Sequence, residues 1–414
     1  MLYNLDRMRP FLVLAVLAFS LPAFAQQPDV EGAKRTIAAI EDLLAQRPND
    51  ANLYFYLSRF KAEVGDKPGA VAAMEKVAEL GEGYLPTKEF GFAAIWDYPP
   101  FQAVRAKLEA KLPRLDYAPT ALRLEDRTII PEGIAFDSHS GRFYLGSIAQ
   151  RRVLELEPDG TMRELPTLGA KLDEILGLAF DGPRRVLYAV STSALTTKGE
   201  KNRRNAVVSF DVDARRLLKR YEVPGARQLN DVTAAPGGRV FASDSGSGAV
   251  YEINIKGPGP DARELVPAGR IRGTNGLAAS ADGKRLHVAH STGLAVVDIA
   301  TGDVKRVENR TRENIGAIDG LYQWQGQLIG VQNVTNPGRV ILITLTPDGS
   351  AVTSVKTMLS HHHNALDEPT TGAVGRDSFY LLAATAVTRY NREGVIERPE
   401  TLPQPTVLRI PLPR

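Results

Sequence analysis

Ile271-Arg-Gly-Thr-Asn-Gly-Leu-Ala-Ala-Ser-Ala-Asp-Gly-Lys-Arg-Leu-His-Val-Ala-His290 contains the unit that organises most of the chain. A short apolar segment follows Asn275-Gly276, and a polar turn over 280–283 follows that segment. Glycine in such a turn readily adopts a positive φ, and aspartate bonds its own backbone. Residues 285–290 then alternate as the side chains of a half-buried strand do. The stretch therefore predicts two strands at one corner of a β-propeller blade.

The same pattern recurs from Glu132 onward, with about 44 to 54 residues between copies, which is the period of a four-stranded blade. The copies are Glu132–Asp137, Leu176–Asp181, Asn230–Ala235, Asn275–Ala279, Asp319–Gln323 and a weaker one at Thr371–Val374. We therefore predict an all-β six-bladed β-propeller over residues 116–414. The strand at 121–125 is expected to pair with 406–410 and so complete the last blade.

Residues 26–115 have a different pattern, with apolar side chains three and four positions apart, which is typical of helices. The predicted helices lie near 37–46, 53–60, 70–80 and 92–108. The first three resemble a tetratricopeptide repeat, in which small residues pack against aromatic ones. One repeat is too few to form a free-standing array. The predicted helical domain is therefore either a structural cap on the propeller or a surface that binds a protein partner.

The N-terminus has the features of a secretory signal peptide over residues 1–25. Arg7 and Arg9 form its basic region, residues 11–21 its apolar region, and Ala23-Phe-Ala25 its cleavage motif. The apolar run is about half of the roughly twenty residues that a membrane-spanning helix needs. We therefore expect a protein exported to the periplasm or secreted, with no membrane association after cleavage.

Composition excludes several classes of function. The chain has 414 residues, with 51 Lys and Arg against 48 Asp and Glu, and no dense basic run, so we expect no nucleic-acid partner. Cysteine is absent, which excludes disulfides, thiolate zinc sites and a cysteine nucleophile.

Four of the six copies begin with an oxygen-bearing side chain: Glu132, Asn230, Asn275 and Asp319. The innermost strand of each blade lines the central channel, so side chains at the start of these strands converge on the axis. Carboxylate and amide oxygens suit one divalent metal ion: calcium is expected, with magnesium, manganese and zinc as alternatives. The competing interpretation is that Asn-Gly and Asp-Gly are simply common turn dipeptides.

These segments resemble the family of senescence marker protein (regucalcin), gluconolactonase and luciferin-regenerating enzyme. The resemblance rests on Glu132-Gly-Ile-Ala-Phe-Asp137, Leu229-Asn-Asp231, Asn275-Gly-Leu-Ala-Ala-Ser-Ala-Asp-Gly-Lys284 and Asp319-Gly-Leu321, and covers the chain from about Thr120 to its end. It implies a six-bladed propeller with a divalent metal on its axis that hydrolyses lactones and related esters. It also implies that Glu132, Asn230, Asn275 and Asp319 are the metal ligands and that Asp319 is the general base.

One position departs from the family pattern. Its sugar lactonases have an arginine two residues before the asparagine of the third blade, whereas this chain has Gln228 there and Arg227 one position earlier. The departure speaks against a sugar-acid lactone as the substrate. Arg227 and Gln228 remain candidate substrate contacts.

Other residues are predicted to surround the site. Asp231, next to Asn230, is a candidate carboxylate behind the metal ligands. His290, His361 and His363 are candidates for the channel mouth, with a polar loop as the competing interpretation for the last two.

Two hypotheses follow from the sequence. The first is an exported, divalent-metal-dependent hydrolase of lactones or related esters, in which a metal-activated water attacks a polarised carbonyl. The second is a non-catalytic propeller, stabilised by its metal, that acts as a binding or scaffold protein.

Overall fold

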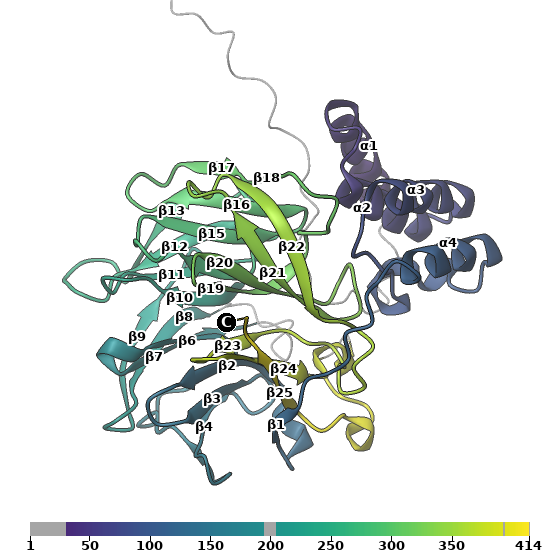
Figure 1. Cartoon of the computed structure of the whole chain (residues 1–414). Coiled ribbons are helices and arrows are strands. Elements are labelled where there is room, and N and C mark those ends of the chain that lie inside the picture. The colour runs from purple at the N-terminus through teal and green to yellow at the C-terminus, as the bar shows by residue number, and fades with distance from the viewer. Residues whose placement is uncertain (1–29, 194–203, 392–393, 414) are drawn as a thin grey trace, which may run out of the picture.

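The computed structural model describes residues 30–193, 204–391 and 394–413 (Figure 1). The predicted signal peptide lies outside these residues. The described chain forms a small group of helices followed by a ring of β-sheets. No helix in these ranges is both long enough and apolar enough to span a membrane.

The helices come first in the chain. They are α1 (Val30–Gln46), α2 (Ala51–Glu63), α3 (Lys67–Leu80) and α4 (Pro99–Glu109). Asp50 and Asp66 cap α2 and α3 by accepting hydrogen bonds from first-turn backbone N–H groups. The first three helices match the predicted positions. The prediction of the fourth helix, as one continuous helix over 92–108, was wrong. Residues 88–95 form two short helices, η1 (Lys88–Phe92) and η2 (Ala93–Ile95), and α4 begins only at Pro99. Proline suits a first helical position because it has no N–H to leave unpaired.

The described residues from Thr120 onward form six sheets, as predicted, and their strands are antiparallel except for one short added strand. The first blade contains β2 (Pro131–Asp137), β3 (Arg142–Ser147), β4 (Arg152–Leu156) and β5 (Met162–Glu164). The second contains β6 (Glu174–Asp181), β7 (Val186–Thr192), β8 (Asn205–Asp211) and β9 (Arg216–Glu222). The third contains β10 (Leu229–Ala234), β11 (Val240–Asp244), β12 (Ala249–Ile253) and β13 (Ala262–Val266).

The fourth blade contains β14 (Leu277–Ala279), β15 (Arg285–His290), β16 (Gly293–Asp298) and β17 (Val304–Arg306). The fifth contains β19 (Ile318–Trp324), β20 (Gln327–Gln332), β21 (Arg339–Leu345) and β22 (Ala351–Leu359), with the short β18 (Glu308–Asn309) added in parallel to β22. The sixth contains β23 (Gly372–Val374), β24 (Ser378–Ala384) and β25 (Thr406–Pro411), and β1 (Thr120–Arg123) is its outermost strand. The predicted pairing of the first strand with the last is thus confirmed.

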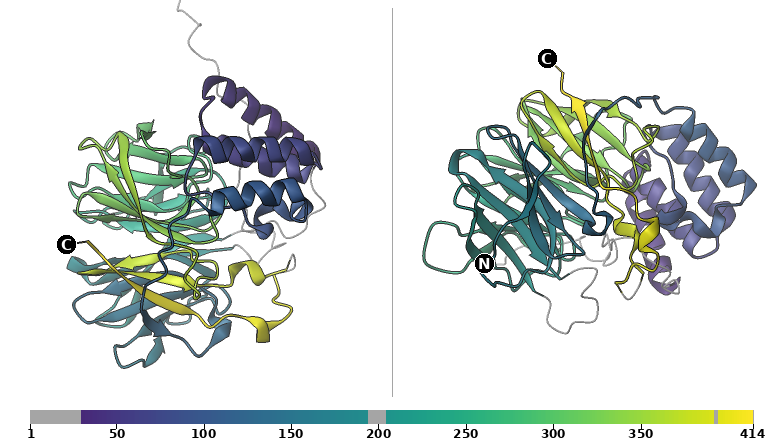
Figure 2. Two further views of the ribbon diagram at one scale, coloured as in Figure 1. Left: turned by 45° about the vertical axis from the view of Figure 1, so that its right-hand side comes forward. Right: turned by 90° about the horizontal axis from the view of Figure 1, so that it is seen from below.

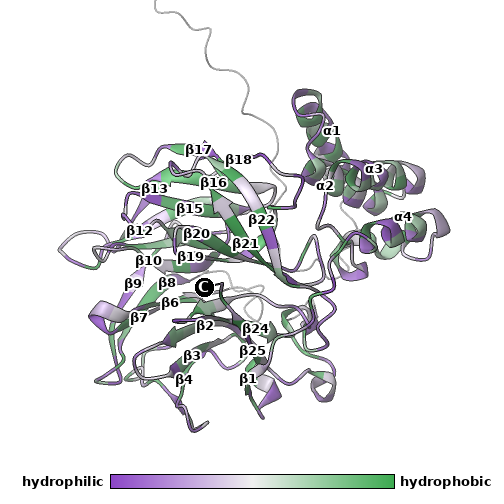
Figure 3. Ribbon diagram, viewed as in Figure 1, coloured by the Kyte–Doolittle hydropathy of each residue, from purple (hydrophilic) through white to green (hydrophobic). Residues whose placement is uncertain are grey.

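The core consists of apolar layers between neighbouring blades. Tyr144 of the first blade packs with Leu187 of the second, for example, and Leu145 of the first packs with Leu382 of the sixth on its other side. Because each central strand is covered on both faces, its residues are nearly all apolar. Figure 3 shows this distribution, with hydrophobic residues on the strands and hydrophilic ones in the connecting loops.

The innermost strands β2, β6, β10, β14, β19 and β23 contact one another in that order, and β23 contacts β2. Their first residues meet so closely around the axis that a side chain does not fit at some positions. At Gly276, a Cβ atom would lie 2.5 Å from the backbone oxygen of Asp319 and 2.5 Å from the backbone nitrogen of Leu321. Glycine at the start of an inner strand is therefore required by the approach of the next blade.

The helices lie on one face of the ring, as does the segment that carries η5 (Val387–Arg389) and η6 (Pro399–Thr401) (Figure 2). Backbone hydrogen bonds join the helical region to loops of the fourth and fifth blades, among them Glu82 N–H to Arg312 O (2.8 Å) and Leu85 N–H to Thr335 O (2.9 Å). These loops lie at the end of the ring where the innermost strands begin.

Arg339 lies at the centre of this junction and is only 2% exposed. It donates hydrogen bonds to Gln332 Oε1 (2.6 Å) and Asn314 O (2.9 Å) and pairs with Glu313 Oε2 (2.9 Å). Gly83 lies directly against the guanidinium group. The buried cation is therefore fully matched, and it fixes the loops on which the helices dock.

The Gly276→Ala substitution is expected to lower the free energy of unfolding by about 1–3 kcal/mol, because the added methyl group must push apart two backbones that cannot move independently. Urea unfolding measures the change. Gly182→Ala is the matched control, since the nearest atom to a Cβ there is 3.7 Å away. Equal stability of the two variants would contradict the requirement for glycine at the hub.

The Arg339→Met substitution is expected to cost about 3 kcal/mol, because it leaves a carboxylate and two buried oxygens without their donors. Limited trypsin digestion should then cut the connection between helices and propeller faster than in the parent chain. Arg310→Met is the control, because Arg310 makes its ion pair with Glu308 at an exposed position. Unchanged stability and cleavage in Arg339→Met would show that the buried cation does not hold the two parts together.

Candidate functional site

Irregular pairing at the start of the innermost strands sets the direction of the predicted ligands. The register between inner strand and neighbour shifts between Pro131 and Ile134 in β2, between Leu229 and Val232 in β10, and between Ile318 and Leu321 in β19. A β-bulge removes a residue from the ladder and re-aims its side chain. Glu132, Asn230 and Asp319 lie in these bulges, and Asn275 lies two residues before the start of β14.

Hydrogen bonds connect these positions across blades. Asn275 Nδ2 donates to Asp319 Oδ1 (2.8 Å). Asn230 Nδ2 donates to Ser245 Oγ (2.9 Å), which in turn donates to the backbone oxygen of Thr274, the neighbour of Asn275 (2.5 Å). The two amide nitrogens are thus engaged, and the two amide oxygens are the atoms left for a ligand.

Three carboxyl groups at this hub are close enough to repel one another; Glu132 and Asp231 are buried, and Asp319 is half-buried. Burial, with the charges of Asp319 and Asp231, raises the pKa of Glu132 well above its ordinary value. Burial raises the pKa of Asp231 to about 7 and that of Asp319 to about 6, although hydrogen bonds to each carboxylate partly offset the shift. Each group would be more stable as an anion if a cation lay beside it.

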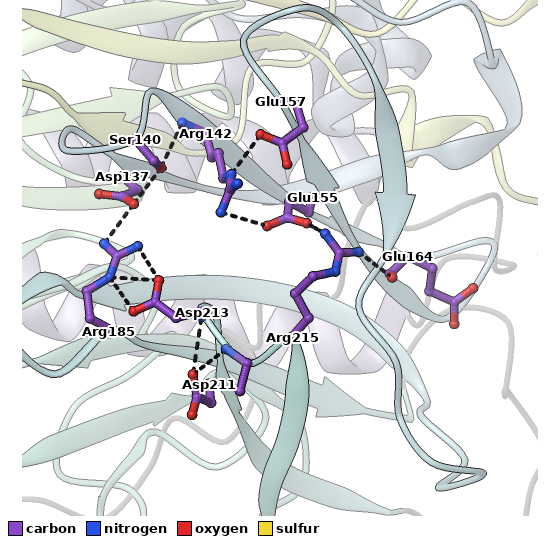
Figure 4. A network of polar contacts seen from close by, with 11 residues as sticks. Asp137, Ser140, Arg142, Glu155, Glu157, Glu164, Arg185, Asp211, Asp213 and Arg215 are labelled. Atoms are coloured by element: carbon purple, nitrogen blue, oxygen red, sulfur yellow. Dashed lines mark hydrogen bonds and ion pairs between the residues drawn. The ribbon is translucent and has the colours of Figure 1, made fainter.

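Several buried carboxylates elsewhere in the ring have such a cation. Figure 4 shows the contacts between the first two blades, where Arg185 pairs with Asp137 (2.7 Å) and Glu155 pairs with Arg142 and Arg215. Although burial opposes it, hydrogen bonds that include those from Ser140 and Arg185 hold the pKa of Asp137 below its ordinary value. No lysine or arginine among the described residues pairs with Glu132, Asp231 or Asp319.

The residues at the hub fit a hard divalent cation. Oε2 of Glu132 is buried and has no hydrogen-bond partner. In the described parts of the chain, no group of three or more His, Cys, Asp or Glu side chains is placed to hold a metal ion, so the amide oxygens of Asn230 and Asn275 would have to complete the site. An all-oxygen set of this kind is typical of calcium, magnesium or manganese.

Asp231 lies behind the predicted ligands. Its Oδ1 accepts the N–H of Val232 (2.8 Å), and its Oδ2 accepts the N–H of Leu277 (3.0 Å) at the start of β14. The carboxylate thus ties the third blade to the fourth.

Arg227 and Gln228 precede β10, and their backbone N–H groups bond to the carboxylate of Asp244 (2.7 and 2.8 Å). The side chain of Arg227 is exposed and that of Gln228 is half-buried. This loop is therefore fixed through its backbone, and whether its side chains contact a substrate stays a prediction.

The three histidines predicted for the channel mouth lie elsewhere. His363 Nε2 bonds to the backbone oxygen of Ala118 (3.0 Å), and His361 lies 3.6 Å from Glu109 at the end of α4. His290 lies beside Arg47 and Arg306. All three contact the helices, the linker or the strands beside them, because these parts cover the face that the sequence pattern left open.

Two residues at the hub were not predicted. Asn333 donates from Nδ2 to Asp319 Oδ2 (2.6 Å) and to Pro369 O (3.0 Å). The Tyr322 hydroxyl accepts a hydrogen bond from the N–H of Gly372 (2.8 Å). It also lies close enough to interact electrostatically with all three hub carboxylates. The spacing along the chain could have indicated Asn333. Ser245 follows Asn230 by 15 residues, and Asn333 follows Asp319 by 14 residues, and each stands where the second strand of its blade ends.

The sequence profile described as the SMP-30/Gluconolactonase/LRE-like region matches residues 130–362. The chain belongs to this family. The matched region contains all four predicted ligands and runs from the inner strand of the first blade to the loop before β23. The helices lie outside it. The chain is thus a lactonase-like propeller with helices added in front.

Several solved structures are similar in fold. That of a gluconolactonase from Xanthomonas campestris covers 73% of this chain and 97% of its own, at 16% identity and a TM-score of 0.46. That of a luciferin-regenerating enzyme covers 69% and 92%, at 14% identity and a TM-score of 0.46. That of virginiamycin B lyase from Staphylococcus aureus covers 64% and 81%, at 16% identity and a TM-score of 0.45. No curated protein sequence matches the chain.

The Glu132→Gln substitution is expected to raise the free energy of unfolding of the metal-free protein by about 0.5–2 kcal/mol, because it removes a buried anion that is repelled by two others. Urea unfolding in EDTA at pH 8 measures this gain, with the exposed Glu75→Gln as control. The same substitution should abolish the stabilisation that added calcium gives to the parent chain. A variant that is less stable without metal, or equally stabilised by it, would contradict the assignment of Glu132.

Proposed function

We propose that the chain is an exported hydrolase of lactones or related esters that depends on one divalent metal ion, with calcium as the expected ion. The proposal is carried by one observation: three carboxyl groups of different blades, the buried Glu132 and Asp231 and the half-buried Asp319, meet at the hub with no described lysine or arginine beside them. Family membership supports the lactonase-like part. Export to the periplasm or the exterior rests on residues 1–25 alone.

The residues proposed to hold the metal are Glu132, Asn230, Asn275 and Asp319. A divalent cation bound there would polarise a substrate carbonyl and lower the pKa of a bound water.

Asp319 is proposed to accept the proton of the attacking water. Its two oxygens receive hydrogen bonds from two different amides, Asn275 at 2.8 Å and Asn333 at 2.6 Å, so the plane of its carboxylate is fixed from both sides. A carboxylate held in position in this way suits general-base catalysis. Asn333 acts only through Asp319 and is a positioning residue.

The substrate class proposed is a lactone or ester other than a sugar-acid lactone. The loop before β10 presents Gln228 where a family member that binds sugar hydroxyls has arginine, and Asp244 holds this loop through its backbone. Because the helices dock at the same end of the ring, they also limit the directions from which a substrate approaches the hub.

A metal-stabilised scaffold is the second candidate. The specific observation in its favour is the fixed docking of the helices across the face where the site opens, centred on Arg339. In that case, the helical face would be the binding surface for a protein partner.

The two candidates differ in the result of one substitution. Asp319→Asn is expected to lower kcat on a lactone and aryl-ester panel by about 10²–10⁴-fold, because the amide cannot accept a proton. The panel is assayed with calcium, manganese, magnesium or zinc added back after EDTA. Asp377→Asn, 71% exposed at the edge of the sixth blade, should leave the rate unchanged. Hydrolysis that persists in Asp319→Asn would remove Asp319 as the base. A folded parent chain that hydrolyses nothing with any of the four metals would favour the scaffold.

A further inference from the structure

A cavity lies between the helices and the propeller, away from the hub residues. Its volume is about 450 Å³, and it is lined by the turn between α1 and α2, by the end of β17 and by β18. Leu80, Tyr84, Val307 and Ile315 form its apolar walls. Binding sites for small molecules are often found at such junctions, with volumes of about 300–1,000 Å³.

Two arginines of this cavity share one carboxylate. Oδ2 of Asp50 accepts from Arg47 Nη1 (3.2 Å) and from Arg306 Nη2 (3.0 Å). One arginine belongs to the turn after α1 and the other to the outermost strand of the fourth blade, so the two parts of the chain meet here. Each guanidinium group offers five N–H donors, and a single shared oxygen uses few of them.

Asp50 has no further capacity to balance these charges. Its Oδ1 caps α2 by accepting the N–H groups of Asn52 (3.1 Å) and Leu53 (3.3 Å).

The other charged groups of the lining are matched elsewhere. Glu308 pairs with Arg310 (2.9 Å), Glu313 with Arg339 (2.9 Å), and Arg312 lies 3.9 Å from Glu82. The cavity therefore keeps one unbalanced positive charge, shared between Arg47 and Arg306.

The positive charge of the two arginines lowers pKa values around the cavity. Burial and the charge of Arg306 lower the pKa of Arg47, although Asp50 opposes the shift. Burial lowers the pKa of His290 to about 4, and both arginines contribute to the shift. The first turn of α2 also opens toward the cavity, and a helix N-terminus favours a negative charge.

We propose that this cavity binds a small organic anion whose carboxylate or phosphate group lies between the guanidinium groups of Arg47 and Arg306. Arginine pairs recognise both groups through two parallel N–H bonds. The volume leaves room for an organic body beside the anionic group. The site is separate from the hub and does not depend on the proposed hydrolysis.

Titration of the purified chain with inorganic phosphate and, separately, succinate tests the proposal. Thermal unfolding is followed in EDTA, so that no metal at the hub contributes, with sodium chloride at equal ionic strength as reference. A ligand that binds only the folded state raises the midpoint of unfolding as its concentration increases. At least one probe is expected to do so beyond the effect of chloride, and the probe that succeeds distinguishes phosphate from carboxylate recognition.

Arg47→Gln and Arg306→Gln are each expected to weaken the binding of that probe by about tenfold or more, because a charge-assisted hydrogen bond is lost. Arg263→Gln is the matched control: Arg263 is 61% exposed on the outermost strand of the third blade, and neither it nor its partner Glu252 lines the cavity. The proposal is overturned if neither probe stabilises the parent chain beyond chloride, or if Arg47→Gln and Arg306→Gln respond as Arg263→Gln does. The titration of the parent chain decides the first point even if one variant does not fold.

Discussion

Six innermost strands must approach one another around a single axis, and the space there is too small for side chains at every position. At Gly276 the backbone of the next blade occupies the place where a Cβ atom would be. The β-bulges at the starts of β2, β10 and β19 have a related origin, since a regular ladder cannot continue into this narrow region. The irregular backbone is what turns Glu132, Asn230 and Asp319 out of the sheets. Geometry needed to close the ring thus also creates the candidate site.

Charge distinguishes the hub from the rest of the propeller. Between the first two blades, buried Asp137 and Glu155 lie against arginines, and the cost of burying the anions is offset. At the hub three carboxyl groups lie together, and no lysine or arginine among the described residues pairs with them. Folding therefore brings together groups that repel one another, which is a common feature of binding sites because a bound cation removes the repulsion.

The helices change the surface of a family propeller in two ways. They cover part of the end of the ring where the inner strands begin, and buried Arg339 fixes the loops on which they dock. They also enclose a cavity whose lining comes from both parts, with Arg47 and Arg306 contributed from opposite sides. The helices and the ring thus share polar and apolar contacts that neither would have alone. A ligand in that cavity would strengthen this junction.

The sequence determined the number of blades, the strand that closes the ring and the first three helices. Strand periodicity and the repeated Gly-containing openings are local signals, because they depend on the sequence of one blade and not on the blades beside it. The sequence did not determine where His290, His361 and His363 lie, that Asn333 and Tyr322 reach the hub, or that the helices enclose a cavity. These features depend on which loops of different blades and helices come face to face. That is set by the rotation of each blade about the axis and by the docking of the helices, and neither is encoded in the spacing along the chain.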